Sequence, residues 1–330
     1  MKLKKEFFGG IIYDEQQKEN ELTLMQKKDL IKQIRTLGTK KISIAGGEPF
    51  ICEDIFHFLK ECNKYDIDVS MTTNGTLFTK EIIKKLNDIK IKNITISFDG
   101  GKEETMNFIR GKGTYNKVLK GLSLLSDEYK GKYSLKTTLM KYNINEIEEI
   151  IKIGMKYNCD MVKFNAVRDD GRASLNKNDI IINQEEYIDT IKNIELLREK
   201  YGKKIKIRAP LNIFCKEDYD YIEELGFGCF AGKESICIDP MGNVRPCSHY
   251  PEQFICGNIK EKKLTDIWNH SSILKKFREL EGNDTCNNCM KYNYCRGGCR
   301  YRCFLQGNIN GVDPFCYLYK NSSKKEPCKY

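Results

Sequence analysis

The stretch Lys41-Ile-Ser-Ile-Ala-Gly-Gly-Glu-Pro49 joins a short β-type run to a glycine turn that carries an acidic side chain. Further β-rich runs lie at 68–72, 93–98, 134–139 and 161–167. Helical periodicity fills the intervals between them, at 23–37, 52–65, 79–89, 115–128 and 145–157. Thr79 and Asn145 are the predicted N-caps of two of these helices.

Strands that alternate with helices predict a parallel sheet joined by right-handed crossovers. A partial TIM-like barrel fits this order, and a doubly wound sheet is the structural alternative. The chemistry of a barrel lies at the carboxyl ends of its strands, which is where Gly46, Gly47 and Glu48 fall.

Composition excludes several classes of protein. The net charge is +10, but the lysines are scattered along the chain and no basic stripe is interleaved with aromatic residues, so we expect no nucleic-acid partner. No apolar run approaches the roughly 20 residues that span a bilayer, so we expect no membrane partner and a cytoplasmic location. Fifteen cysteines in a cytoplasmic chain favour metal ligation over disulfides.

The amino-acid composition changes near Pro210, after which cysteines, glycines and aromatic residues become frequent. We therefore expect a first domain over 1–209, of which 172–209 is a bridging segment, and a cysteine-rich second domain over 210–330.

Cysteine spacing in the second domain is the strongest signal of the sequence. Cys229 is followed by Gly242 after twelve residues and by Cys247 after four more. The run Cys286-x2-Cys289-x5-Cys295-x3-Cys299 and then Cys316 complete the pattern. Thiolates at such spacings suit iron-sulfur clusters, and a tetrahedral zinc site is the alternative.

This pattern resembles the SPASM module of radical S-adenosylmethionine (SAM) maturases. The resemblance implies two auxiliary 4Fe-4S clusters with interleaved ligands. The first would be held by Cys229, Cys247 and Cys299, and the second by Cys286, Cys289, Cys295 and Cys316. Cys237 and Cys215 are candidates for a fourth ligand of the first cluster.

Six other cysteines have no place in the pattern. Cys52, Cys62 and Cys159 lie in helical or apolar contexts, and we expect them to be buried as small hydrophobic residues. Cys256, Cys303 and Cys328 remain unassigned.

Three motifs at strand ends resemble the radical SAM core. They are Gly46-Gly-Glu-Pro49, Thr72-Thr-Asn-Gly75 and Ser97-Phe-Asp-Gly100. The resemblance implies that Gly46, Gly47, Glu48 and Pro49 form the loop at the methionyl amino group of SAM, that Ser97 contacts the ribose, and that Arg110 approaches SAM. Asn74 and Asp99 are expected to shape loops or make secondary contacts.

The core's cluster motif, CxxxCxxC, does not occur in the 330 residues. It would fall at or before Lys5-Glu-Phe-Phe8, so we expect an N-terminally truncated sequence that also lacks the first strand of a (β/α)6 barrel. A degenerate, cluster-free enzyme is the alternative. A SAM-cleaving 4Fe-4S cluster is expected only if the missing motif exists.

The resemblance implies an oxidoreductase that uses a 5′-deoxyadenosyl radical to abstract hydrogen from a ribosomally made precursor peptide, forming a thioether, a C–C crosslink or a related bond. One alternative is formylglycine formation as in anaerobic sulfatase maturases, although those enzymes have aspartate after the cysteine equivalent to Cys247, where this chain has Ser248. The other is a catalytically inactive iron-sulfur protein that binds peptide or transfers electrons.

The implied partners are the precursor peptide or protein, a separate leader-peptide-binding protein, and an electron donor such as flavodoxin or ferredoxin. No catalytic residue can be named from the pattern. His249 and Tyr250 are weak candidates for a base or a radical relay, because they follow Cys247 closely.

Overall fold

The computed structural model describes residues 6–8, 11–13, 20–169, 173, 177–209, 228–289 and 292–316. The chain forms two compact units, the first including Leu22–Pro210 and the second including Leu211–Tyr330. A short two-stranded sheet, β1 (Glu6–Phe8) and β2 (Ile11–Tyr13), precedes residue 22 in the sequence. Among the described residues, no helix is both long and apolar enough to cross a membrane.

A six-stranded parallel sheet forms the centre of the first unit. Its strands are β3 (Lys41–Ile44), β4 (Asp68–Thr73), β5 (Asn93–Ser97), β6 (Tyr133–Leu139), β7 (Met161–Ala166) and β8 (Lys206–Arg208). They are neighbours in sequence order, from β3 to β8. A doubly wound sheet would reverse its strand order at a switch point, so this order confirms the barrel-type prediction and excludes the alternative.

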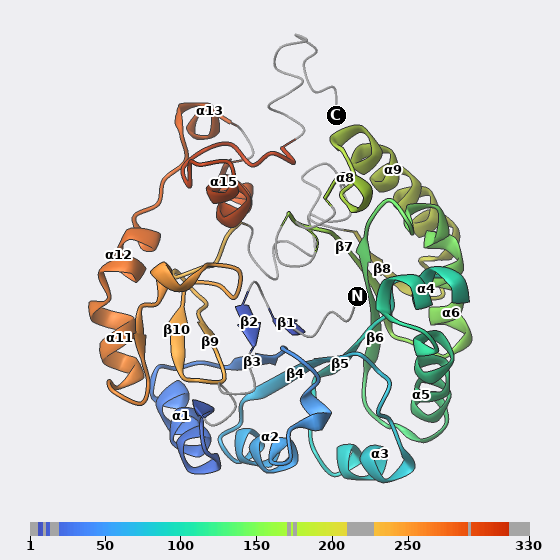
Figure 1. Ribbon diagram of the computed structural model, residues 1–330, viewed down its shortest axis with the longest axis horizontal. Coiled ribbons are helices and arrows are strands. Elements are labelled where there is room, and N and C mark those ends of the chain that lie inside the picture. The colour runs from blue at the N-terminus through green and yellow to red at the C-terminus, as the bar shows by residue number, and fades with distance from the viewer. Residues whose placement is uncertain are drawn as a thin grey trace. The chain divides into compact units, whose positions relative to one another are not determined.

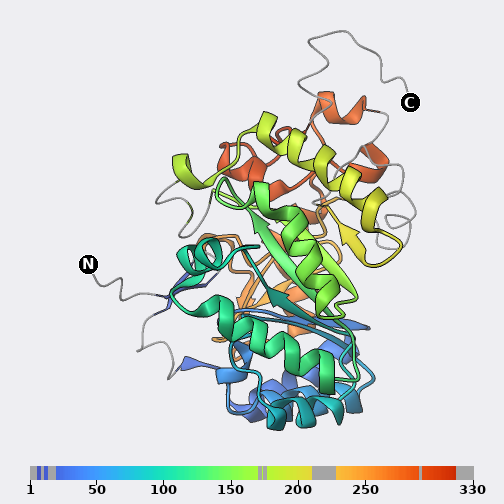
Figure 2. The same cartoon turned by 90° about the vertical axis from the view of Figure 1, so that its right-hand side faces the viewer.

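The helices of the first unit cover one face of this sheet, as Figures 1 and 2 show. They are α1 (Leu24–Thr36), α2 (Ile55–Lys64), α3 (Lys80–Asn87), α4 (Glu103–Arg110), α5 (Thr114–Glu128), α6 (Ile147–Lys156), α8 (Lys177–Ile180) and α9 (Gln184–Tyr201), with short 3-10 turns η2 (Pro49–Ile51) and η3 (Ile144–Glu146). Burial alternates along the strands accordingly. Val69 and Met71 of β4 are buried, whereas Ser70 and Thr72, which alternate with them along the strand, are partly exposed.

The predicted strands and helices of the first unit are confirmed, and one of the two predicted N-caps is wrong. Helix α4 and strand β8 were not predicted, and β8 lies inside the segment predicted to bridge the domains. Thr79 caps α3 as predicted, since its side chain accepts a hydrogen bond from the Ile82 amide at 3.2 Å. Asn145 is not an N-cap, because the chain makes a 3-10 turn there and α6 follows Glu146 without a side-chain cap.

The second unit contains short elements around a small antiparallel sheet. Its strands are β9 (Cys237–Ile238), β10 (Asn243–Arg245) and β11 (Gly257–Asn258). Its helices are η4 (Glu252–Phe254), α11 (Leu264–His270), α12 (Ser272–Arg278), α13 (Asp284–Asn287), α14 (Tyr292–Cys295) and α15 (Arg300–Leu305). Gly242 sits in the β9–β10 turn with φ of 91°, a conformation that favours glycine.

Helix α5 packs so closely on the loop after β4 that Gly121 has no room for a side chain. A Cβ at this position would lie 2.6 Å from the Gly75 carbonyl oxygen. We expect Gly121→Ala to lower the free energy of unfolding by roughly 1–3 kcal/mol, because overpacking outweighs the helix propensity gained. Urea unfolding monitored by circular dichroism measures this. The matched control is Ser123→Ala on an exposed position of the same helix, which should leave stability unchanged or slightly raised.

Candidate functional site

The Gly46–Pro49 loop is fastened to the end of the neighbouring strand by the Glu48 carboxylate. One Glu48 oxygen accepts a hydrogen bond from Thr73 Oγ1 at 2.6 Å, and the other accepts one from the Asn74 amide at 2.6 Å. Gly46 has φ of 143° and is exposed, so its backbone is open to a ligand. The first oxygen also accepts a hydrogen bond from the Phe50 amide at 3.3 Å. The second oxygen retains a lone pair, so Glu48 can still accept a hydrogen bond from an ammonium group.

The loop after β4 is a tight polar turn. The Asn74 side chain accepts hydrogen bonds from the Thr76 amide at 2.8 Å and the Thr76 hydroxyl at 2.7 Å. Gly75 follows with φ of 75°. Asn74 therefore shapes the loop through its side chain, while its backbone amide holds Glu48.

Asp99 and Arg110 form an ion pair beside the end of β5. The Asp99 side chain is 4% exposed, and one of its oxygens accepts hydrogen bonds from Arg110 Nε at 2.7 Å and Nη2 at 2.5 Å. Its other oxygen accepts a hydrogen bond from the Thr138 amide at 2.7 Å. This geometry fixes the Arg110 guanidinium, which stays 27% exposed and able to meet a ligand. Ser97, at the end of the same strand, is partly exposed.

Two buried residues that sequence reasoning missed support the loop after β5. The Asn143 amide group donates to the carbonyl oxygens of Asp99 and Thr138, both at 2.9 Å. The Glu146 carboxylate accepts from the Gly101 amide at 2.8 Å and from the Thr105 hydroxyl at 2.6 Å. In sequence these are ordinary polar residues before a helix, and no local pattern marks them as buried.

In the second unit, the three cysteines predicted for the first auxiliary cluster lie in one neighbourhood. Cys229, Cys247 and Cys299 all pack against a buried core formed by Ala231, Tyr250, Phe277 and Tyr301. Burial raises the pKa of the Cys229 thiol, and the nearby thiols of Cys299 and Cys247 raise it further. Residues 229, 247 and 299 are far apart in sequence, so the fold itself brings them together.

Of the two candidates for a fourth ligand, one is adjacent to this group. Burial raises the pKa of the Cys237 thiol to about 11, and the neighbouring Cys247 thiol contributes to the shift. Cys237 lies on β9, directly opposite Arg245 of β10. Cys215 lies outside the described residues.

The four cysteines predicted for the second cluster form two neighbouring pairs. Burial raises the pKa of the Cys286 thiol, with Cys289 nearby. Burial also raises the pKa of the Cys295 thiol to about 11, and the nearby Cys316 thiol contributes to the shift. Across the described ranges, however, no three His, Cys, Asp or Glu side chains converge closely enough to hold a metal ion.

The donor chemistry around Tyr250 nevertheless fits an iron-sulfur cluster. Tyr250 is 1% exposed, and its buried hydroxyl has no hydrogen-bond partner among the described residues. Burial, followed by the surrounding thiols of Cys229, Cys299 and Cys247, raises its pKa. Buried hydroxyl groups normally donate a hydrogen bond. A sulfur atom of an iron-sulfur cluster bound by these three thiols would accept the hydrogen bond that the Tyr250 hydroxyl lacks.

The same burial argues against Tyr250 as a base. Its ring packs against Phe254 at 4.6 Å and Phe277 at 5.0 Å between centroids, and the raised pKa disfavours the phenolate that proton abstraction needs. His249 packs its ring 5.3 Å from that of Tyr301. Neither residue gains a catalytic role from this packing.

The cysteines outside the predicted ligand sets have several environments. Cys62 and Cys159 are buried as expected, and burial raises the pKa of each thiol to about 12. Cys303 is buried in the second unit, and Cys256 is partly buried there. Cys52 was expected in the core but is only partly buried, because its thiol donates to Asp54 Oδ1 at 2.9 Å in a group that includes Lys27. Cys328 lies outside the described residues.

Comparison with known families agrees with this arrangement. The Radical SAM superfamily model matches residues 9–153, and the model of the iron-sulfur cluster-binding domain SPASM matches residues 229–290. The chain therefore contains a radical SAM domain and a SPASM domain. Members of this superfamily are enzymes of the radical SAM oxidoreductase type, which use SAM and iron-sulfur chemistry.

Similar proteins include two curated relatives. The mycofactocin maturase MftC of Mycolicibacterium smegmatis is 24% identical over 307 residues, which cover 90% of this chain and 75% of the relative. The AdoMet-dependent heme synthase of Methanosarcina barkeri is 24% identical over 328 residues, covering 92% of this chain and 89% of the relative.

Two solved structures share the fold. Streptococcus suis SuiB bound to the precursor peptide SuiA superposes with a TM-score of 0.73 at 18% identity, covering 88% of this chain and 67% of that one. Native anSMEcpe with bound AdoMet and Cp18Cys peptide gives a TM-score of 0.72 at 20% identity, covering 92% and 89%.

We expect Asn143→Ala to destabilise the first unit by roughly 2–3 kcal/mol, because it leaves two buried carbonyl oxygens and the Met140 amide without their hydrogen-bond partner. Urea unfolding compared with Asn145→Ala, an exposed neighbour, measures the effect. Equal stability of the two variants would show that water replaces the lost hydrogen bonds.

Tyr250→Phe removes only the unpartnered hydroxyl. In cluster-free protein we expect unchanged or slightly higher stability, since a buried unsatisfied group disappears. After anaerobic cluster reconstitution we expect a lower midpoint potential for one cluster, because a hydrogen bond to its sulfur is lost. A redox titration followed by electron paramagnetic resonance measures this, and an unchanged potential would mean that the hydroxyl does not reach the cluster.

Proposed function

We propose that this chain is a radical SAM/SPASM maturase that modifies a ribosomally synthesised precursor peptide. The observation that carries the proposal is the combination of the two family matches in one chain with a SAM-type loop whose Glu48 is held by β4. The relationship to MftC, named as a maturase, and the shared fold with SuiB, whose structure contains a precursor peptide, support a peptide substrate.

The residues of the first unit have distinct parts in this proposal. Gly46 and Gly47 present backbone to SAM, and Glu48 accepts its ammonium group. Arg110, oriented by Asp99, and Ser97 complete the contacts at the ends of the strands. When bound, SAM supplies the group that abstracts hydrogen from the substrate.

In the second unit the proposed ligands follow the groups described above. Cys229, Cys247 and Cys299 hold the first auxiliary cluster, with Cys237 as the fourth ligand. The second cluster is held by Cys286, Cys289, Cys295 and Cys316. Clusters held by these cysteines would supply a site for substrate or an acceptor for the electron left after bond formation, and a flavodoxin or ferredoxin is the proposed external donor.

The residues present do not fit the SAM-cleaving cluster, since the 330 residues contain no CxxxCxxC. This same observation favours a second candidate function, an iron-sulfur protein that binds SAM and peptide, or transfers electrons, without cleaving SAM. Formylglycine formation is less favoured, because Ser248 follows Cys247.

Two measurements on anaerobically reconstituted protein separate these functions. SAM binding by isothermal titration calorimetry tests the first unit, and methionine release under reducing conditions tests cleavage. Binding with methionine release supports the maturase. Binding without release supports the second candidate, and the absence of SAM binding contradicts both.

Cluster ligation is tested by iron and labile sulfide content. We expect Cys286→Ala/Cys289→Ala to lose close to one cluster's iron, because two thiolate ligands of one cluster are removed. The matched control is Cys52→Ala, which removes a partly buried thiol of the first unit and should retain all iron. Iron content unchanged in the double variant would contradict the assignment, and zinc in place of iron would indicate a structural zinc site.

A further inference from the structure

A buried arginine adjoins the thiols of the second unit. Arg245 is the last residue of β10, and its side chain is 3% exposed. Its register partner on the antiparallel neighbour β9 is Cys237, and Cys247 follows it by two residues. Directly opposite residues of an antiparallel pair project from the same face, with Cβ atoms about 5 Å apart. The arginine and the Cys237 thiol therefore share one face of the small sheet.

The charge of Arg245 reaches this thiol. Burial, followed by the Cys247 thiol and the Asp239 carboxylate, raises the pKa of Cys237, and Arg245 acts in the opposite direction. A cation has this effect on a thiol only at close range or through a medium of low polarity. The guanidinium therefore lies within electrostatic reach of the group formed by Cys237 and Cys247.

One N–H group of this guanidinium has no acceptor. The buried Nε of Arg245 makes no hydrogen bond within the ranges that the structure describes. A buried charged donor without a partner is unfavourable, because it has lost water and gained nothing in return. An acceptor on a group bound beside Arg245 would remove this cost.

Asp239 forms an ion pair with Arg245, but the pair is loose. Arg245 Nη2 lies 3.4 Å from Asp239 Oδ2, longer than the roughly 2.7–2.9 Å of a charge-assisted hydrogen bond. The Asp239 oxygens also have other donors. Oδ1 accepts from the Met241 amide at 3.0 Å and the Asn243 amide at 2.9 Å, and Oδ2 accepts from Asn243 Nδ2 at 3.0 Å. Asp239 therefore mainly holds the β9–β10 turn, and Arg245 Nε is left for another acceptor.

A second donor without an acceptor adjoins the same thiols. The Tyr250 hydroxyl is buried near Cys229, Cys299 and Cys247 and makes no hydrogen bond among the described residues. Arg245 is near Cys237, which is itself a neighbour of Cys247. Two unsatisfied donors in one group of thiols indicate that their acceptor is a group that the thiols hold.

Another buried arginine of this unit shows that such a vacancy is not general. The Arg300 side chain is also buried, but its two Nη groups donate to four backbone carbonyl oxygens. Carbonyl oxygens thus supply acceptors for Arg300 from within the unit. Arg245 Nε has none in the described part of the chain.

We propose that Arg245 donates a hydrogen bond from Nε to a sulfur atom of the first auxiliary cluster and raises the reduction potential of that cluster. The inference rests on the proposed function, in which Cys229, Cys247 and Cys299 hold the cluster, and adds to it a residue that tunes its potential. A nearby positive charge and a hydrogen bond to sulfur both favour the reduced form, because it carries one more negative charge. A higher potential favours electron uptake, which is one of the roles proposed for these clusters.

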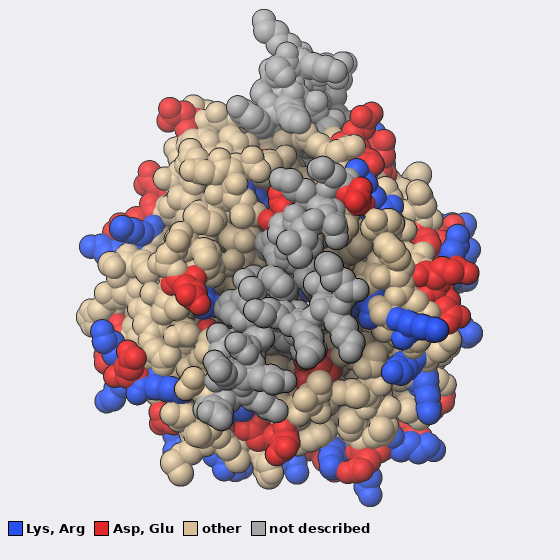
Figure 3. All heavy atoms as spheres, viewed as in Figure 1, with Lys and Arg blue, Asp and Glu red and all other residues tan. Residues whose placement is uncertain are grey.

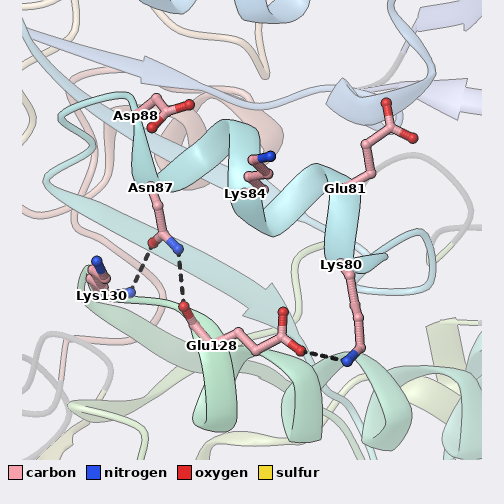
Figure 4. A pocket seen from close by; sticks show the side chains of 7 residues that line it. All are labelled: Lys80, Glu81, Lys84, Asn87, Asp88, Glu128 and Lys130. Atoms are coloured by element: carbon pink, nitrogen blue, oxygen red, sulfur yellow. Dashed lines mark hydrogen bonds and ion pairs between the residues drawn. The ribbon is translucent and has the colours of Figure 1, made fainter.

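Cations on the surface are balanced in another way. In the hollow of Figure 4, between α3 and the end of α5, Lys80 pairs with Glu128 at 3.0 Å. The Asn87 side chain there hydrogen-bonds to the backbones of Glu128 and Lys130. On the face drawn in Figure 3, Lys and Arg are interspersed with Asp and Glu. Arg245 differs from these residues because burial withholds water from it, so a bound group must supply what solvent supplies at the surface.

The test is a redox titration of full-length, anaerobically reconstituted protein, followed by electron paramagnetic resonance. The signal of the first cluster is the one lost in Cys229→Ala/Cys247→Ala. We expect Arg245→Met to lower the ratio of reduced to oxidised first cluster at a fixed potential by about tenfold, which is about 59 mV for one electron. Arg245→Lys keeps the charge but places a methylene where Nε stands, so it should show part of this fall.

The matched control is Lys276→Met, which removes the same charge from an exposed site of α12 and should leave the potential at its wild-type value. Arg245→Met exchanges the guanidinium for an apolar chain of similar length, so cluster-free protein should unfold at the same urea concentration as the wild type. A purely structural arginine would give the reverse result, a loss of stability in urea without a change of potential.

Iron content and SAM binding, measured on the same samples, separate this inference from the proposed function. Full iron in Arg245→Met with an unmoved potential overturns the inference and leaves the ligand assignment standing. So does a wild-type potential in Arg245→Lys, which also decides the matter if Arg245→Met fails to hold the cluster. A wild type that shows no cluster signal dependent on Cys229 and Cys247 contradicts the ligand assignment and the inference together. Absence of SAM binding contradicts the proposed function, whatever the potentials are.

Discussion

The parallel direction of all six strands in the first unit is the constraint on which its other features depend. A parallel neighbour can be reached only by a crossover, and right-handed crossovers place every helix on the same side of a sheet whose strands follow in sequence order. One face is therefore apolar and covered, and the other is left for polar side chains. The loops after the strands meet at one edge, which is why Glu48, Asn74, Asp99 and Ser97 belong to one region.

Within that region, two carboxylates connect neighbouring strands. Glu48 joins the loop after β3 to the end of β4, and Asp99 joins the end of β5 to β6 through the Thr138 amide. In the proposed function these two acids also take part in binding SAM, Glu48 directly and Asp99 by orienting Arg110. The proposal therefore gives the same side chains a structural and a binding role.

Most of the fold could be predicted from the sequence because strands and helices each leave their own local pattern of apolar residues. The five strands that were predicted are β-rich runs bounded by turns, whereas β8 has only three residues, Lys206–Arg208, two of which are basic. Asn143 and Glu146 were not recognised, because burial of a polar residue depends on partners more than 40 positions away. The grouping of Cys229, Cys247 and Cys299 was expected only through resemblance, since spacing alone does not reveal proximity in space.

The buried thiols of the second unit have a chemical consequence for the chain before any cluster is inserted. Thiolates, not thiols, react with electrophiles and oxidants, and burial keeps Cys229, Cys237 and Cys295 protonated. Stray disulfide formation and alkylation should therefore be slow in the folded apoprotein. Iron must instead displace protons to enter, so that maturation of this unit is expected to acidify its surroundings and to proceed faster in mildly alkaline buffer.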